Sequence, residues 1–263
     1  MTNTLRLFFT NTFRPLKLNI IAALLVLTST SGVAASMPSG GAGGPQGTFA
    51  GQTIVVNGVT RSYRMVVPKN VTSAKAAPLL FAFHGLYDNQ YLMPLYTFLD
   101  LLAAEQGFIV VYPDALNGVW SMAGGTYAAP DVAFFDAMYA KIGASYNVDL
   151  NGVYLTGMSM GAYFTNILAA ERADKIAAIM VHSGTLGLFA FLPINVTHKY
   201  AVMVVQGASD PVVNVSEGVK TRDLYTKWGH PAQYFQVPNW GHFWAYPIDV
   251  NHKMWSFFMA HPR

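Results

Sequence analysis

The chain has 263 residues, of which 52% are hydrophobic and 11% charged, and it contains no cysteine. This composition argues against a disordered chain and against a small domain held by disulfides, and the length suffices for one large domain with a buried core. The formal net charge of +3 comes from residues 1–35, because these hold three basic and no acidic residues and leave 13 of each sign in the rest. The charge therefore favours neither nucleic acid nor an anionic membrane as a partner.

Residues 1–35 have the pattern of a signal peptide. Arg6, Arg14 and Lys17 give a basic start, an apolar run follows at 18–27, and small residues stand at 33–35. The run is short for a membrane span, and an uncleaved anchor is the alternative. We therefore expect a secreted protein, extracellular or periplasmic, whose mature chain begins near Ser36 and has no stable membrane association.

A Gly-rich segment at 36–48 is expected to be a flexible tether, and residues 49–263 to form the folded domain. The first predicted element is a β-hairpin, with strands at 53–56 and 62–67 around Asn57 and Gly58. This dipeptide is strongly favoured in two-residue hairpin turns. The domain should therefore open with an antiparallel pair of strands.

Beyond the hairpin, short apolar runs alternate with longer amphipathic stretches. The runs predict strands at 79–83, 108–112, 153–156, 176–181, 201–205 and 234–237, and the stretches predict helices at 93–106, 132–144, 160–172, 217–228 and 250–259. Such alternation is typical of parallel strands joined by crossover helices. The predicted class is α/β, with a mostly parallel central sheet, an antiparallel N-terminal hairpin and helices on both faces. In such sheets the chemistry lies just after the strands.

A G-x-S-x-G motif follows the strand at 153–156 and precedes a helical pattern. It spans 157–161 and has Ser159 at its centre. A strand, a sharp turn and a helix in this order form the nucleophile elbow of the α/β-hydrolase fold, which lifts the serine hydroxyl above the sheet. Ser159 is therefore the predicted nucleophile.

A serine hydroxyl needs a neighbouring base, and the base needs an acid that fixes its tautomer. His242 follows the last predicted strand, whereas His230 precedes it, at the wrong end of the sheet. Asp210 follows the strand at 201–205 and stands between Ser159 and His242, in the chain order of this fold. Two other aspartates stand in the same interval, but both have helix-like surroundings and are interpreted as solvated charges: Asp174 and Asp223.

The remaining site predictions concern groups around the reacting carbonyl. The fold takes its oxyanion donors from the backbone after the nucleophile and after an early strand, which here are Met160 and Leu86. Large apolar side chains adjoin these positions and should contact substrate: Tyr87, Met158, Trp240 and Trp244. Neither clustered metal ligands nor a phosphate-binding glycine loop is present in the pattern, so no metal and no cofactor are expected.

Five segments together resemble the polyhydroxybutyrate depolymerase and feruloyl esterase group of α/β-hydrolases, which is similar to carbohydrate esterase family 1. They lie at 81–85, 111–114, 157–161, 182–184 and 241–242. The resemblance implies a secreted serine carboxylic-ester hydrolase acting through an acyl-enzyme. Its substrates would be small or polymeric esters, of hydroxycinnamoyl (feruloyl) or polyhydroxyalkanoate type.

Three alternatives remain open from the sequence: an acetyl-polysaccharide esterase, an acyltransferase that passes the acyl group to a sugar or lipid hydroxyl, and a binding module without activity. The apolar side chains beside the predicted site favour a hydroxycinnamoyl or similarly apolar ester over an acetyl ester. The sequence leaves the oligomeric state open.

Overall fold

We describe the protein from a computed structural model, which covers residues 35–122, 124–186, 194–246 and 249–263. The predicted signal peptide lies outside these ranges except for Ala35. In the part of the chain that is described, no helix combines the length and the apolar character that a membrane span requires.

The predicted hairpin is present and is longer than expected. Strands β1 (Gly47–Val56) and β2 (Val59–Val67) pair in antiparallel register. Asn57 and Gly58 both have positive φ, at 49° and 79°, as the tight hairpin turn requires. The pairing of β1 with β2 extends beyond the predicted strand at 53–56, across a register shift between Phe49 and Gln52. Because of this extra pairing, β1 begins before residue 53.

Residues of the predicted tether hydrogen-bond to the domain. The backbone N–H groups of Ser39 and Gly43 donate to the carbonyls of Val148 and Ser145, at 2.8 and 3.1 Å. The Gln46 side-chain amide donates to two carbonyls of the loop after β2. Regular strand structure then starts at Gly47, two residues before the predicted start of the domain.

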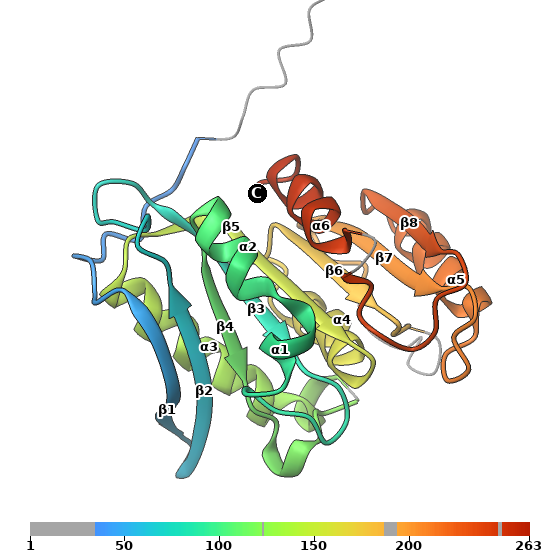
Figure 1. Cartoon of the computed structure of the whole chain (residues 1–263), viewed down its shortest axis with the longest axis horizontal. Helices are drawn as coiled ribbons and strands as arrows, with labels where there is room; N and C mark the ends of the chain where they lie inside the picture. Colours follow the sequence, from blue (N-terminus) through green and yellow to red (C-terminus); the bar gives the residue numbers. More distant parts are fainter. Residues whose placement is uncertain (1–34, 123, 187–193, 247–248) are drawn as a thin grey trace, which may run out of the picture. The chain divides into compact units, whose positions relative to one another are not determined.

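Six further strands complete the sheet: β3 (Ala77–Phe83), β4 (Ile109–Pro113), β5 (Val148–Met158), β6 (Ala178–His182), β7 (Ala201–Gly207) and β8 (Ala232–Val237). The order is β1-β2-β4-β3-β5-β6-β7-β8, and all pairs from β4 to β8 are parallel (Figure 1). Strand β2 is antiparallel to β4. This is the predicted mostly parallel sheet of an α/β-hydrolase.

Helices cover both faces of this sheet (Figure 1). One apolar cluster joins the sheet to α3 (Ala129–Ser145), α4 (Met160–Glu171) and α5 (Val215–Lys227). A second cluster joins it to α2 (Leu99–Gln106) and α6 (Val250–Met259). Alternate residues of β3 belong to opposite clusters, Phe81 to the first and Leu80 to the second, because successive strand side chains point to opposite faces.

The helix predicted at 93–106 is interrupted. It forms α1 (Met93–Thr97) and α2, separated by Phe98 in the left-handed region at φ 53°. The carbonyl of Thr97 accepts a hydrogen bond from the Asn251 side chain at 2.7 Å instead of continuing the helical ladder. Because this bond comes from a residue far along the chain, the local pattern predicted one helix and missed the break.

Candidate active site

Ser159 stands at the junction of β5 and α4 in a strained backbone conformation, with φ 53° and ψ −120°. Its backbone N–H donates to the carbonyl of His182, at the end of the neighbouring strand β6, at 2.9 Å. A non-glycine residue at positive φ is uncommon and persists only where its surroundings hold it. The elbow predicted from the sequence is therefore formed, with the serine at its apex.

The two motif glycines are required by close backbone approaches. A Cβ on Gly161 would collide with the carbonyl oxygen of Phe83, at the end of β3. A Cβ on Gly157 would collide with the backbone of Gly161. Only glycine allows the start of α4 to pass this close to the sheet.

Asp210 and His242 are in direct contact. The histidine Nδ1 lies 2.8 Å from Asp210 Oδ2, and the aspartate side chain is 0% exposed while that of the histidine is 18% exposed. The backbone N–H groups of Val212 and Val213 donate to Asp210 Oδ1, and the Gln206 amide donates to Oδ2. The loop after β7 thus holds the carboxylate in one orientation beneath the ring.

The charge of Asp210 fixes the tautomer of His242. Burial by itself would raise the pKa of Asp210, but the hydrogen bonds from Val213, His242 and Val212 outweigh it and hold the pKa below its usual range. An ionised carboxylate can only accept, so the ring donates from Nδ1 and keeps Nε2 as an acceptor. This is the tautomer that a general base needs.

The loops that carry the two residues are tied together. Gly207 ends β7, and a Cβ there would collide with the carbonyls of Trp240 and Gly241. The N–H of Ser209 donates to the Trp240 carbonyl at 2.9 Å. The missing side chain at Gly207 therefore lets the loop after β8 reach the aspartate.

His182 supports the same loop from below. Its Nε2 accepts a hydrogen bond from the backbone N–H of Ala245 at 3.1 Å, and its ring stacks on Trp244. Complete burial lowers the pKa of His182 to about 3, with a smaller electrostatic contribution from the nearby His242. At neutral pH the ring is therefore uncharged, and its Nε2 can accept the Ala245 N–H. The sequence around His182 did not indicate this role.

Two backbone donors adjoin the serine. Among the described residues, the N–H groups of Leu86 and Met160 have no hydrogen-bond acceptor. Leu86 follows Gly85, where a Cβ would lie 3.8 Å from that of Ser159. His84 anchors this loop, since its Nε2 accepts from the Ala115 N–H at 3.1 Å. The two N–H groups are thus available to a carbonyl oxygen beside the serine.

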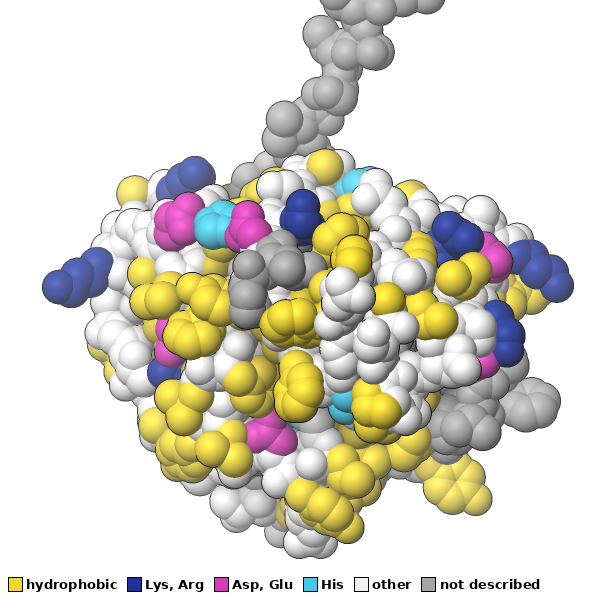
Figure 2. Space-filling view, turned by 45° about the vertical axis from the view of Figure 1, so that its right-hand side comes forward, with side chains coloured by type: hydrophobic (Ala, Val, Ile, Leu, Met, Phe, Trp, Pro, Cys, Tyr) yellow, Lys and Arg dark blue, Asp and Glu magenta, His cyan; other side chains and the backbone are white. Residues whose placement is uncertain are grey.

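Ser159 and His242 line one cavity of about 510 Å³. Among the described residues, no hydrogen bond joins Ser159 Oγ to His242; this bond is often long before substrate binds and shortens in the complex. Leu86, predicted as an oxyanion donor, and Met158 and Trp244, predicted to contact substrate, also line this cavity. Hydrophobic side chains gather over much of the surface drawn in Figure 2.

Besides Asp210, which is hydrogen-bonded to His242, three of the predicted site residues are not among those that line the cavity. Tyr87 points outward and is 75% exposed. Met160 packs against the first apolar cluster, and Trp240 packs against the second and donates from Nε1 to the Phe243 carbonyl. Five lining residues were not predicted: Gly85, Asp88, Tyr96, Val212 and Phe243. Gly85 and Phe243 could have been found by their places next to Leu86 and His242, whereas the others come together only in the fold.

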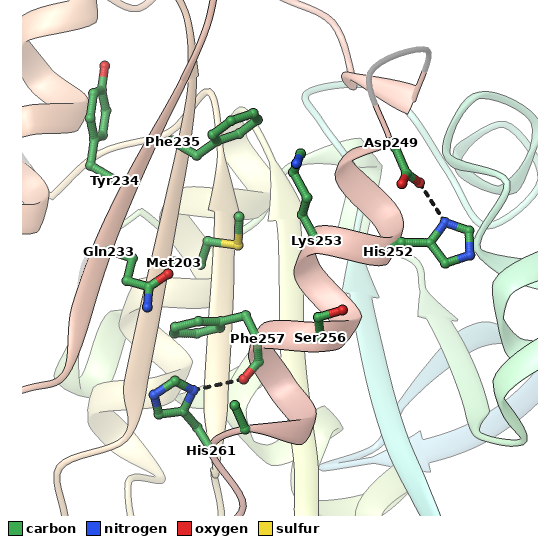
Figure 3. A pocket seen from close by; sticks show the side chains of 11 residues that line it. Met203, Gln233, Tyr234, Phe235, Asp249, His252, Lys253, Ser256, Phe257 and His261 are labelled. Carbon is green, nitrogen blue, oxygen red and sulfur yellow. Dashed lines mark hydrogen bonds and ion pairs between the residues drawn. The ribbon is translucent and has the colours of Figure 1, made fainter.

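A second cavity, of about 570 Å³, lies between β7, β8 and α6 (Figure 3). It holds none of the predicted residues. Its two histidines are already engaged, since Nδ1 of His252 bonds to Asp249 and Nδ1 of His261 bonds to the Phe257 carbonyl (Figure 3). The described ranges contain no group of three or more acidic, histidine or cysteine side chains suited to a metal ion.

The order and direction of the strands, with helices on both faces, define the α/β-hydrolase fold. Residues 61–234 match the model of the family described as Esterase PHB depolymerase. The chain belongs to this family and is a carboxylic ester hydrolase.

Named relatives agree with this placement. Feruloyl esterase D of Neurospora crassa is 31% identical over 218 residues, which cover 78% of this chain and 72% of that protein. A bifunctional acetylxylan esterase/xylanase of Neocallimastix patriciarum is 31% identical over 166 residues, which cover 61% of this chain and 23% of that protein. The solved structure of a ferulic acid esterase from Anaeromyces mucronatus, in complex with ferulic acid, has a TM-score of 0.63 at 16% identity and covers 89% of this chain and 93% of that one.

Proposed function

We propose that the protein is a serine esterase in which Ser159 is the nucleophile, His242 the general base and Asp210 the acid that orients it. The observation that carries this assignment is the hydrogen bond of 2.8 Å between buried Asp210 and His242, whose ring lines the same cavity as the strained Ser159. Ring and serine come from loops at the same end of the parallel sheet. This is the arrangement that activates a serine hydroxyl.

The reaction proceeds in two halves. Ser159 Oγ attacks the ester carbonyl carbon while its proton passes to His242 Nε2, and the C–O bond to the alcohol breaks as His242 returns that proton to the leaving oxygen. Water then attacks the acyl-enzyme, giving its proton to His242, which returns it to Ser159 as the acid is released. The N–H groups of Leu86 and Met160 stabilise the oxyanion in both halves.

The acyl group is proposed to be hydroxycinnamoyl, of the feruloyl type, or a comparably apolar polyhydroxyalkanoate-type group. Five apolar side chains line the cavity: Leu86, Met158, Val212, Phe243 and Trp244. Such a lining binds a ligand through buried apolar area and ring contacts. The feruloyl esterase named above supports this class of substrate.

A second candidate is an acetyl-polysaccharide esterase, which the acetylxylan esterase/xylanase relative favours. The size and apolar lining of the cavity argue for the larger acyl group. Acyl transfer to a sugar or lipid hydroxyl would use the same acyl-enzyme. Product analysis with and without an alcohol acceptor separates transfer from hydrolysis.

We also propose that the enzyme acts outside the cytoplasm after cleavage of residues 1–35. The support is the basic, apolar and small-residue sequence of this segment. Mass spectrometry of the exported protein should give a chain beginning near Ser36. An intact leader on membrane-bound protein would contradict the proposal.

The function is tested with a panel of esters and two variants. We expect the wild type to hydrolyse methyl ferulate with a higher kcat/KM than an acetylated sugar, and a fluorophosphonate to label it but not Ser159→Ala. Unchanged labelling of Ser159→Ala would overturn the nucleophile. A clear preference for the acetylated sugar would overturn the substrate class and leave the nucleophile in place.

A further inference from the structure

Among the described residues that line the active-site cavity, Asp88 is the one carboxylate. A charged group at the wall of an otherwise apolar cavity costs free energy unless it has hydrogen-bond partners. Ligand cavities commonly combine an apolar lining with a few placed polar groups that fix the orientation of the ligand. Asp88 is thus placed to fix the orientation of a ligand that carries a hydrogen-bond donor.

The carboxylate has a fixed place relative to the nucleophile. The Asp88 N–H donates to the carbonyl of Gly85 at 3.2 Å, which closes a turn, and Gly85 adjoins Ser159. Asp88 Oδ1 accepts the N–H of Asn89 at 2.7 Å. The same turn carries the Leu86 N–H, so the oxyanion donor and the carboxylate are held together.

Tyr96, from α1, orients the other oxygen. Its hydroxyl donates to Asp88 Oδ2 at 2.7 Å. Burial first, and then the charge and hydrogen bond of Asp88, raise the pKa of Tyr96 well above its usual range, so the phenol keeps its proton. Each carboxylate oxygen thus accepts one bond from the protein and retains a lone pair for a further donor.

We propose that Asp88, oriented by Tyr96, is a specificity-determining residue that accepts a hydrogen bond from a hydroxyl group on the acyl part of the substrate. The hydroxyl is the phenol of a hydroxycinnamoyl group, because an aromatic ring would contact the apolar side chains of the lining, Phe243 and Trp244 among them, which a short hydroxyalkanoyl chain would leave largely uncovered. The inference rests on the proposed function. It adds that the enzyme recognises the free phenol.

The test compares methyl ferulate with methyl 3,4-dimethoxycinnamate, in which the phenol is methylated and can no longer donate. We expect the wild type to favour methyl ferulate in kcat/KM by about tenfold or more, the size of a hydrogen bond to a charged acceptor. Asp88→Ala should bring the ratio to near one, and Asp88→Asn, which keeps an acceptor but loses the charge, should give an intermediate ratio. Asp174→Ala, which removes an exposed carboxylate elsewhere, is the control and should keep the wild-type ratio.

A wild-type ratio near one, or a ratio that Asp88→Ala and Asp88→Asn leave unchanged, overturns the inference while the proposed esterase function stands. Hydrolysis of methyl ferulate that survives in Ser159→Ala overturns the function instead. A second pair, methyl 3-hydroxybutyrate and methyl butyrate, tests the aliphatic source of the hydroxyl. If the wild type prefers methyl 3-hydroxybutyrate through Asp88 but shows no such preference for methyl ferulate, the assignment to the phenol is overturned and the contact belongs to the hydroxyl of a hydroxyalkanoate.

Discussion

The imidazole Nε2 of His182 accepts a hydrogen bond from the backbone N–H of Ala245 at 3.1 Å, and the backbone carbonyl of His182 accepts one from the N–H of Ser159 at 2.9 Å. One residue at the end of β6 therefore supports both the nucleophile elbow and the loop of the proposed base. Since the ring must stay neutral to accept, the stability of this end of the sheet is coupled to pH.

We predict that His182→Phe lowers the free energy of unfolding by about 1–3 kcal/mol at pH 7, because the buried Ala245 N–H loses its acceptor. The pKa of His182 is about 3 in the folded chain and about 6.5 in a free histidine, so the unfolded chain takes up the proton first. The contribution of this residue is complete above pH 6.5 and falls as the pH drops towards 3, by at most about 1.4 kcal/mol per pH unit.

Urea unfolding of both proteins from pH 4 to pH 8 checks this. The difference between wild type and variant should shrink as the pH falls. The control is His252→Gln: its exposed ring lies beside Asp249 and Glu105, which raise its pKa, so its contribution should instead be lost as the pH rises. A difference between wild type and His182→Phe that grows towards acid would contradict the assignment.

Ser159→Ala and Ser159→Gly should both lose about 10⁴- to 10⁶-fold in kcat, since either change removes the covalent route. They should differ in stability. Glycine tolerates φ 53° and ψ −120°, whereas alanine keeps the strain, so the glycine variant should be the more stable by about 1 kcal/mol. Thermal or urea unfolding of the two variants, together with a kcat measurement, tests this difference. Equal stabilities of the alanine and glycine variants would show that the elbow is unstrained.

Asp210→Asn should lower kcat by about 10⁴-fold, because an amide nitrogen facing His242 would favour the wrong tautomer. Asp174→Asn and Asp223→Asn make the same chemical change on side chains that are 77% and 61% exposed, and both should keep wild-type rates. If Asp210→Asn is active while one of the two control variants is inactive, the acid of the triad has been assigned to the wrong residue.

Much of the fold could be predicted from the sequence because its signals are local. The hairpin turn at Asn57, the buried parallel strands and the elbow at Ser159 each follow from short patterns. The break at Phe98 could not be predicted, since it depends on Asn251, which lies 154 positions away from the carbonyl it binds.

The same distinction between local and long-range signals applies to the cavity. The sequence shows which residues adjoin the predicted site residues, but it does not show in which direction their side chains point. Trp240 packs against the second apolar cluster and its indole N–H bonds to the Phe243 carbonyl, whereas Phe243 lines the cavity. Asp88 and Tyr96 meet through a turn and a helix that no single pattern connects.

Phe243 gives the last prediction. It lines the cavity and is still 70% exposed, so an aromatic acyl group could cover its ring. We expect Phe243→Ala to lower kcat/KM for methyl ferulate about fivefold, equivalent to about 1 kcal/mol of lost apolar contact, and to change p-nitrophenyl acetate less than about twofold. Tyr127→Ala removes an aromatic ring that is 78% exposed and does not line the cavity, so it should change neither ester. Trp240→Ala should instead lower both rates together, because it releases the loop that carries His242. If Phe243→Ala also lowers both esters equally, the ring serves the loop and makes no contact with the acyl group.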